Sequence, residues 1–330
     1  MIAITGANGL VGNYVSRLLL SHGKAVRLLV RNANDPALQN LHEKVEIVET
    51  DILDTLGLQK AFEGVQAVAH TAAVVSFWRR KHSEMLKINV EGTNNVVNVA
   101  LQMGVKRLVY VSSIAALGRS ELGSGVLDEQ SAWTNSSQNS MYARSKYKAE
   151  LAVLRGIEEG LNAVIVNPGV ILGLSEWSRS SSNIFRKMAN RQWFFPPGGN
   201  GFVGANDVAK VIALLIDRED FIGERFILVS ENLSYQQVFA SIAKAFGNDP
   251  PTIKIHAQLI LLAGIVSELI SLISQKEPFV SLESTRTAGK TYQYSHQKLI
   301  DAMNFSFEPI ESVINELVPR YIERYGLNRR

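Results

Sequence analysis

Three glycines spaced Gly-x-x-Gly-x-x-Gly constrain this chain more than any other feature, because they stand between a predicted strand and a predicted helix. The strand is the apolar run Met1–Thr5, and the helix is Val11–Ser21, where apolar residues recur at helical spacing. Gly6 allows a tight turn, Gly9 lets a ligand approach the backbone, and Gly12 lets the helix pack closely on the strand. The free N–H groups of a helix N-terminus favour an anion. The pattern therefore predicts a turn that binds the pyrophosphate of a dinucleotide.

The first half of the chain alternates short apolar runs with helical patterns, as βαβ units do. The apolar runs are almost continuous in Val, Ile, Leu and Ala, which is typical of parallel strands covered by helices on both faces. We expect strands at 1–5, 25–31, 44–50, 65–70, 105–112 and 161–166, and helices at 11–21, 56–62, 82–103 and 141–158. This predicts an α/β fold with a Rossmann-type doubly wound parallel sheet.

The composition shifts toward loops after residue 167, which suggests a second unit. We assign residues 1–167 to a dinucleotide-binding domain, with residues 203–230 threaded back into it. Residues 168–202 and 231–330 are assigned to a smaller, mostly helical C-terminal lobe that binds substrate.

Composition narrows the chemistry of this chain. It has 330 residues, of which 46% are hydrophobic and 20% charged, so it can bury a large core. It contains no cysteine, which excludes disulfides, a thiolate nucleophile and cysteine-ligated metals, and we expect no metal site. The formal net charge of +3 is small, and no basic run carries interleaved aromatic residues, so nucleic acid is not an expected partner. We expect a small-molecule substrate.

The end of the second predicted strand indicates which dinucleotide binds. An NAD-binding protein usually carries Asp or Glu about 20 residues after the glycine turn, where the carboxylate binds the ribose 2′-OH. Arg31 stands at that place here, Asn32 follows it, and the next carboxylate is that of Asp35. Because a cation favours an added 2′-phosphate, we expect NADP(H) over NAD(H). The competing interpretation is that Arg31 is only a solvated strand end.

Tyr142 and Lys146 are four residues apart in a predicted helix, so they share one face. A free tyrosine has a pKa near ~10, and a neighbouring cation lowers that pKa toward the range useful for proton transfer. The fifth predicted strand ends in Ser112 and Ser113, at the carboxyl edge where doubly wound sheets bind ligands. A serine hydroxyl there can bind a substrate carbonyl beside the tyrosine. The order of these motifs predicts an acid–base site next to the dinucleotide.

Together these motifs resemble the extended short-chain dehydrogenases/reductases, the NAD-dependent epimerase/dehydratase family. The resemblance covers nearly the whole chain, and it is most specific in residues 1–170. The stretches 109–118 (VYVSSIAALG) and 167–173 (NPGVILG) are most similar to the dihydroflavonol reductase and 3β-hydroxysteroid dehydrogenase branch.

The resemblance implies roles for single residues. Tyr142 would protonate the substrate oxygen, Ser113 would polarise it, and Lys146 would hold the ribose and tune Tyr142, with Ser112 as the fallback serine. Asp51 would meet the adenine, residues 71–73 would lie against the dinucleotide, and Asn89 would lie near the nicotinamide. The cofactor-binding residues expected in this way are Gly6, Asn8, Gly9, Leu10, Val11, Gly12, Arg31, Asp51, Ile52, Thr71, Ala72, Ala73, Asn89, Val166 and Pro168.

Aromatic residues in the predicted loops near this edge suggest an apolar or aromatic-walled pocket, with Phe77, Trp78 and Trp177 as candidate substrate contacts. We therefore expect an oxidoreductase that acts on a ketone or secondary alcohol. A nucleotide-sugar epimerase with retained NAD(P) is the alternative, and a cofactor-sensing regulator is a third.

Departures from related enzymes bear on these alternatives. Sugar epimerases carry an arginine before the late Asp-Val-Ala, and the stretch 200–209 lacks it, although Arg179, Arg186 or Arg191 could substitute. Ile114 replaces the acid that dehydratases place beside the serine, which argues against dehydration.

The apolar stretch Ala257–Ile273 is interrupted by Gln258, Ser267, Glu268 and Ser271, so it falls short of a membrane-spanning helix. We expect a buried or partner-facing helix, with docking on a membrane surface as the alternative.

The basic run at 79–82 is interpreted as a solvated face, with an anionic substrate as the alternative. With no targeting segment apparent at the start, we expect a cytoplasmic protein without a transmembrane segment, and a homodimer.

Overall fold

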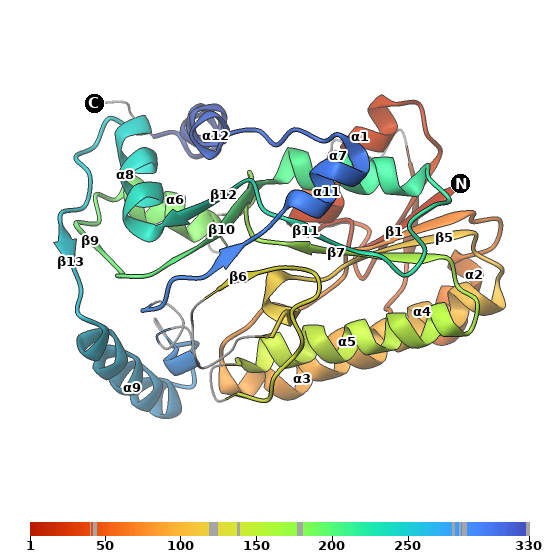
Figure 1. Cartoon of the computed structure of the whole chain (residues 1–330), viewed down its shortest axis with the longest axis horizontal. Coiled ribbons are helices and arrows are strands. Elements are labelled where there is room, and N and C mark those ends of the chain that lie inside the picture. The colour runs from red at the N-terminus through yellow and green to blue at the C-terminus, as the bar shows by residue number, and fades with distance from the viewer. Residues whose placement is uncertain are drawn as a thin grey trace.

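The computed structural model describes residues 1–330 except 40, 42–44, 119–124, 137–138, 177–180, 279–280, 284, 286–288 and 328–330. Its centre is a sheet of seven parallel strands in the order β11-β7-β5-β4-β1-β2-β3 (Figure 1). These strands are β1 (Ile2–Thr5), β2 (Val26–Val30), β3 (Glu46–Glu49), β4 (Ala67–His70), β5 (Arg107–Val111), β7 (Ala163–Pro168) and β11 (Arg225–Leu228). The chain order reverses between β1 and β4, which confirms the predicted doubly wound fold.

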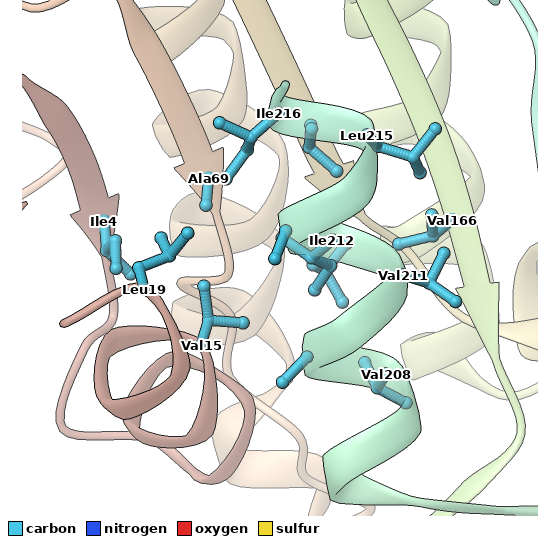
Figure 2. Packing of buried hydrophobic residues seen from close by; sticks show 14 of the residues in the cluster. Ile4, Val15, Leu19, Ala69, Val166, Val208, Val211, Ile212, Leu215 and Ile216 are labelled. Atoms are coloured by element: carbon cyan, nitrogen blue, oxygen red, sulfur yellow. The ribbon is translucent and has the colours of Figure 1, made fainter. Parts of the chain in front are cut away.

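Helices cover both faces of this sheet because successive strand residues point to opposite sides. On one face α1 (Leu10–Ser21) and α7 (Ala205–Ile216) pack against alternate strand residues such as Ile4 and Ala69 (Figure 2). On the other face lie α2 (Thr55–Ala61), α4 (Gly92–Gln102) and α5 (Met141–Glu158). The sheet is therefore buried on both sides, as its apolar strands require.

The helix expected over 82–103 is not one regular α-helix. It consists of α3 (His82–Leu86), a π-helical turn η4 (Lys87–Glu91) and then α4. Such π-helical turns occur mostly as single interruptions, frequently at functional sites. This turn contains Asn89, whose contacts are described below.

A smaller unit, built from the second half of the chain, stands beside the seven-stranded sheet. A three-stranded sheet of β8 (Val170–Leu172), β10 (Gly199–Gly204) and β12 (Glu231–Ser234) contributes to its core. Its main helices are α6 (Ser182–Ala189), α8 (Tyr235–Ala245) and α12 (Ile310–Tyr325). Between these segments the chain returns to the large sheet through α7 and β11.

Short elements complete the structure. Two-residue strands form the pairs β6 (Val126–Leu127) with β14 (Gln293–Tyr294), and β9 (Phe194–Phe195) with β13 (Ile253–Lys254). One strand pair, β6 with β14, joins the two units. The remaining short helices are η1 (Pro36–Leu38), η3 (Arg79–Lys81), η5 (Ile114–Ala116) and α11 (Gln297–Met303).

The apolar stretch after β13 forms α9 (Ala257–Ser274), which stands at one corner of the molecule (Figure 1). The expectation that this helix is buried is wrong, because large side chains such as Leu262 (57% exposed) and Ile273 (86% exposed) face outward in this chain. Across the described ranges, the structure has no helix with the length and hydropathy needed to cross a bilayer.

Candidate active site

The candidate site lies where the carboxyl ends of β1, β4 and β5 meet. Because these strands are parallel neighbours, the glycine turn after β1 lies beside the segment after β4. Gly6 has a φ of +68°, and a Cβ there would lie 2.7 Å from the Cα of Ala72. Thr71 donates from its hydroxyl to the Thr5 carbonyl at 2.7 Å. Only glycine at position 6 permits both the turn and this close approach.

The glycine turn offers an uncapped helix N-terminus. Gly9 is the N-cap of α1, and no side chain caps the helix there. A Cβ at Gly9 would meet only the Gly6 carbonyl, at 3.1 Å, whereas one at Gly12 would collide with the Gly6 carbonyl at 2.4 Å. Gly12 therefore serves packing. The Gly9 N–H donates to the Gly6 carbonyl at 2.9 Å, so the N–H groups of Leu10 and Val11 in the first turn of α1 are the ones suited to phosphate. The chain's own geometry fits a bound dinucleotide.

Arg31 follows β2 and is exposed, and it forms no ion pair with any residue in the described ranges. Two carboxylates occupy the same loop region. Asp35 accepts a hydrogen bond from the Asn8 amide at 2.8 Å, and Glu49 accepts one from the Ala33 N–H at 3.1 Å. Arg31 is thus available to an anion, although Asp35 adds a nearby negative charge.

The residues expected around the adenine are held by local contacts. Asp51 accepts a hydrogen bond from the Leu53 N–H at 2.9 Å, which fixes the turn after β3. Ile52 is 8% exposed and packs against Gly92, where a Cβ would lie 2.4 Å from its Cδ1. Ala73, by contrast, is exposed after β4.

Asn89 is a buried clamp between segments. Its amide oxygen accepts from the Val74 N–H at 2.7 Å, and its amide nitrogen donates to the Val74 carbonyl at 2.9 Å and the Ser145 hydroxyl at 2.9 Å. Both ends of the amide are therefore occupied by protein. Asn89 positions the segment after β4 relative to α5 rather than presenting a free group.

The structure brings Ser113, and not Ser112, to Tyr142. The Ser113 hydroxyl lies beside the Tyr142 hydroxyl and accepts from the Ala115 N–H at 3.1 Å. Ser112 is 5% exposed and lies beside the Tyr110 hydroxyl instead. Burial raises the pKa of Tyr142, and the neighbouring Ser113 hydroxyl opposes that rise. Tyr142 is therefore a protonated phenol at neutral pH, ready to donate.

Lys146 lies one helical turn beyond Tyr142 and is only 2% exposed. Its Nζ donates to the Val111 carbonyl at 2.8 Å and lies 4.7 Å from the centre of the Tyr110 ring. Burial lowers the pKa of Lys146 to about 7, and the Glu150 carboxylate partly offsets that effect. The lysine thus changes charge near neutral pH.

A buried network lies beneath this lysine and was not predicted from the sequence. Glu150 is fully buried, and it accepts from Asn167 at 2.7 Å and from Arg225 at 2.6 Å. Asn167 also donates to the Ser113 carbonyl at 2.9 Å. The network connects the charge beside Lys146 to the backbone of the site serine. Glu150 follows Lys146 by four residues, and this helical spacing is the signal that could have identified it.

His70 is a second residue that the sequence reasoning missed. It is fully buried at the end of β4, and burial together with the Lys146 charge lowers its pKa to about 3. The Thr93 hydroxyl donates to the Asn89 carbonyl at 2.6 Å, so it accepts from His70 Nε2 at 3.0 Å. His70 Nδ1 then accepts from the Thr5 hydroxyl at 2.7 Å. A neutral His70 therefore links β1 to the helix that carries Asn89.

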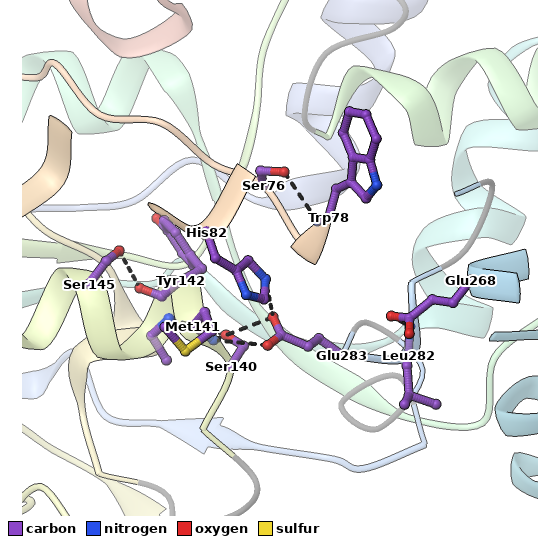
Figure 3. Close-up of polar contacts among 11 residues, drawn as sticks. Ser76, Trp78, His82, Ser140, Met141, Tyr142, Ser145, Glu268, Leu282 and Glu283 are labelled. Carbon is purple, nitrogen blue, oxygen red and sulfur yellow. Dashed lines mark hydrogen bonds and ion pairs between the residues drawn. The ribbon is translucent and has the colours of Figure 1, made fainter. Parts of the chain in front are cut away.

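The substrate candidates are placed unequally. The Phe77 ring packs edge-on against the Tyr142 ring, with centroids 6.2 Å apart. Trp78 follows, and its backbone N–H donates to the Ser76 hydroxyl at 3.2 Å (Figure 3). Trp177 lies outside the described residues.

Two predicted cofactor residues lie in β7. Val166 has no exposed surface and packs beneath α7 (Figure 2), so its side chain belongs to the core rather than to the groove. Pro168 is buried at the carboxyl end of the same strand, at the edge where the site lies.

Comparison with known proteins decides the family. The model of the NAD dependent epimerase/dehydratase family matches residues 2–228. The chain belongs to this family. The proteins that resemble it include Sterol demethylase protein B of Methylococcus capsulatus, which is 32% identical over 264 residues, covering 78% of each chain. Cinnamoyl-CoA reductase 1 of Oryza sativa is 27% identical over 334 residues, covering 96% of this chain and 89% of that protein.

A solved structure agrees with this family placement. The crystal structure of gox2253 is similar with a TM-score of 0.83 and 31% identity, over 99% of this chain and 98% of that chain. The chain is therefore an enzyme of a nicotinamide-dependent family, with oxidoreductases among its relatives.

Proposed function

We propose that the chain is an NADP(H)-dependent oxidoreductase that transfers hydride between the nicotinamide and a ketone or secondary alcohol of a small apolar or aromatic substrate. The observation that supports this most strongly is the pairing of Tyr142 with Ser113, whose hydroxyl lies close enough to lower the pKa of the tyrosine. It lies one helical turn from the buried Lys146, at the carboxyl edge of the sheet and beside the glycine turn.

The roles of the three side chains follow from their positions. The bound cofactor supplies or accepts the hydride. The Tyr142 hydroxyl holds the proton that neutralises the substrate oxygen, and the Ser113 hydroxyl binds and polarises that oxygen. Lys146, when protonated, stabilises the Tyr142 phenolate that remains after the proton has left. Burial excludes water from Lys146, whereas Ser113 and Tyr142 are half-buried and remain open to a substrate.

Arg31 supports NADP(H) as the cofactor, because its guanidinium is exposed at the end of β2, where a 2′-phosphate would lie. We expect Arg31→Ala to lower kcat/KM for NADPH by about tenfold or more, since a charge-assisted bond to phosphate is lost. The value for NADH should change less than threefold. If both cofactors respond equally, or the variant keeps the original preference, Arg31 does not select the cofactor.

An apolar or aromatic substrate is favoured by the aromatic wall beside the acid. Phe77 contacts Tyr142 edge-on, and the relatives include proteins named for a cinnamoyl-CoA and a sterol. We place the substrate beside Tyr142, on the side that faces the smaller unit. We also expect a homodimer in the cell interior.

The direct test incubates purified protein with NADPH and a panel of aromatic and steroid ketones. Loss of the reduced-nicotinamide absorbance, with formation of the corresponding alcohol, would support the proposal. No oxidation of NADPH or NADH across the panel, from a protein that binds the cofactor, would contradict it.

A nucleotide-sugar epimerase is the second candidate, and one observation favours it. Arg186, Lys187 and Arg191 line a cavity of about 450 Å³ together with Trp193 and Phe194. A cationic cavity of this kind suits a diphosphate. Incubation with UDP- and GDP-sugars separates the two functions, because epimerised sugar without net oxidation of cofactor would replace the oxidoreductase proposal. Arg186→Ala should then weaken sugar turnover while leaving ketone reduction unaffected.

A further inference from the structure

Helix α9 has the opposite polarity from that of a normal surface helix. The side that faces the protein buries one large aliphatic residue, Ile260, and otherwise carries small and polar residues at helical spacing: Gly264, Ser267, Glu268 and Ser271. The side that faces outward carries large aliphatic residues that are 39% to 86% exposed: Leu259, Leu261, Leu262, Ile265, Val266, Leu269, Ile270, Leu272 and Ile273. A surface helix ordinarily buries its apolar stripe, so this orientation requires an explanation.

The inward side is fixed by contacts, and this determines which side faces outward. Glu268 accepts from the Leu282 N–H at 3.2 Å, and the Ser271 hydroxyl donates to the Lys276 carbonyl at 2.6 Å. Gly264 lies against Thr285, where a Cβ would be 2.9 Å from the Thr285 Cγ2. The polar stripe is therefore used within the protein, and rotating the helix to bury its leucines would break these contacts.

The composition of the outer face distinguishes lipid from protein as its occupant. Its large side chains are all Leu, Ile or Val, along a helix of about 27 Å, and it carries no aromatic residue, methionine or arginine. Its exposed polar residues, Gln258 and Ser274, stand at the two ends of the helix. Protein interfaces are enriched in aromatic residues, methionine and arginine. A face whose middle is aliphatic matches acyl chains, which offer no hydrogen-bonding group.

Positive charges flank this face. Lys254 precedes the helix and Lys276 follows it, and both are exposed, with Glu277 as a neighbouring acid. The exposed Arg79 and Arg80 of η3 form no ion pair with any residue that the structure describes. They adjoin His82, whose Nε2 lies 3.8 Å from the Glu283 carboxylate in the segment that packs on α9. Cations around an aliphatic face complement an anionic lipid surface.

We propose that α9 lies flat on an anionic lipid bilayer, with its aliphatic face among the acyl chains and the flanking cations at the headgroups. This docking does not depend on the reaction at Tyr142. The two sites are nevertheless joined, because Glu283 accepts from the N–H of Met141, at 3.2 Å from one carboxylate oxygen, immediately before Tyr142 (Figure 3). Docking would therefore place the lipid surface next to the helix that carries the acid.

The test measures sedimentation of the full-length protein with vesicles of phosphatidylcholine alone or mixed equally with phosphatidylglycerol. We expect binding to the mixed vesicles. The triple variant Leu262→Gln/Leu269→Gln/Ile273→Gln removes three outward side chains from one face and should lower the partition coefficient by about 100-fold or more. Arg79→Ala/Arg80→Ala should weaken binding to mixed vesicles by about tenfold and leave binding to neutral vesicles unchanged.

A matched control replaces three exposed aliphatic residues elsewhere, as Leu56→Gln/Leu151→Gln/Ile222→Gln, and should bind as the wild type does. The proposal fails if the wild type does not bind mixed vesicles, or if the α9 variant binds them as strongly as the control. It also fails if the wild type is a dimer without vesicle affinity and the α9 variant is a monomer, because α9 would then contact a second copy of the chain.

Discussion

Helices α5 and α9 have equal length, and both turn polar residues toward the protein. They differ in what those residues contact and in what the outer face carries. Both have 18 residues. On α5 the charges of Lys146 and Glu150 are buried, and the partners around them satisfy hydrogen bonds in the candidate active site. On α9 the inward polar stripe has modest structural contacts, while the outward side leaves nine large aliphatic side chains exposed.

Both arrangements cost free energy: α5 buries charged groups, and α9 exposes apolar ones. A buried charge costs several kcal/mol unless it is paired, so the lysine and glutamate of α5 persist because each has a partner. An exposed aliphatic side chain forgoes about 1.5–3 kcal/mol of burial free energy. We attribute the first exception to the proposed reaction and the second to docking. Four substitutions test this comparison.

The largest effect should come from Tyr142→Phe, which removes the acid and keeps the ring against Phe77. We expect kcat for ketone reduction to fall by about 10²–10⁴-fold, because general acid catalysis is lost. The dissociation constant for NADPH should be unchanged, as measured by fluorescence titration. Turnover within tenfold of the wild type would assign the acid to another residue.

Glu150→Gln should break the buried pair on α5 and leave the Arg225 guanidinium, one-fifth exposed, without its carboxylate. We expect the free energy of unfolding in urea to fall by about 2–4 kcal/mol, since an uncompensated charge remains. The Glu150 charge raises the pKa of Lys146, so its removal lowers that pKa below about 7. The alkaline limb of kcat/KM for reduction should therefore move to lower pH.

A double variant separates these two effects of Glu150. Glu150→Gln/Arg225→Met removes both charges of the pair and should recover most of the lost stability. The alkaline limb should stay at the lower pH, because Lys146 still lacks its neighbouring carboxylate. If the alkaline limb of kcat/KM returns to its wild-type pH when the free energy of unfolding recovers, Glu150 acts only on the fold.

Glu283→Gln tests the connection between the two helices. Its carboxylate accepts from the first N–H of α5, at Met141, and sits near the positive end of the helix dipole. We expect a loss of about 0.5–1 kcal/mol in unfolding free energy, with KM affected more than kcat. Glu277→Gln, an exposed acid after α9, is the control and should change neither quantity.

The smallest effect should come from Leu269→Gln on α9. Leu269 is 55% exposed, so we expect the free energy of unfolding to change by less than about 0.5 kcal/mol. Leu151→Gln on α5, 45% exposed, should behave alike, whereas Val153→Ala, fully buried on α5, should cost about 1 kcal/mol or more. A loss above 1.5 kcal/mol for Leu269→Gln would show that the outer face of α9 is packed within the protein.

The features that could be predicted from the sequence are those set by the spacing of residues close together in the chain. The glycine turn, the apolar parallel strands and the helix at 141–158 follow from turn chemistry and periodicity, and the structure places the last of these at Met141–Glu158. Ser113 was predicted as the site serine, with Ser112 as the fallback, because the two are adjacent. Both follow the end of β5, and the structure places Ser113, the N-cap of η5, beside Tyr142 while Ser112 is buried.

Long-range partnerships were not predictable. Glu150, Asn167 and Arg225 lie on separate elements, and nothing in their local sequence indicates that they meet. His70 likewise becomes a neutral link because two threonines, Thr5 and Thr93, approach it from different segments. Such contacts depend on how the sheet is ordered.

The sequence by itself determined the fold class, the glycine turn and the Tyr142–Lys146 pair, because each rests on the few residues of one turn or helix. Only the tertiary structure decided how buried these groups are and which partners they have. Burial sets the pKa of Lys146 near 7, and packing against Leu282 and Thr285 turns the leucines of α9 outward. The physical reason is that spacing fixes the direction of neighbouring side chains, whereas solvent exclusion and pairing depend on chain segments that come together only in the fold.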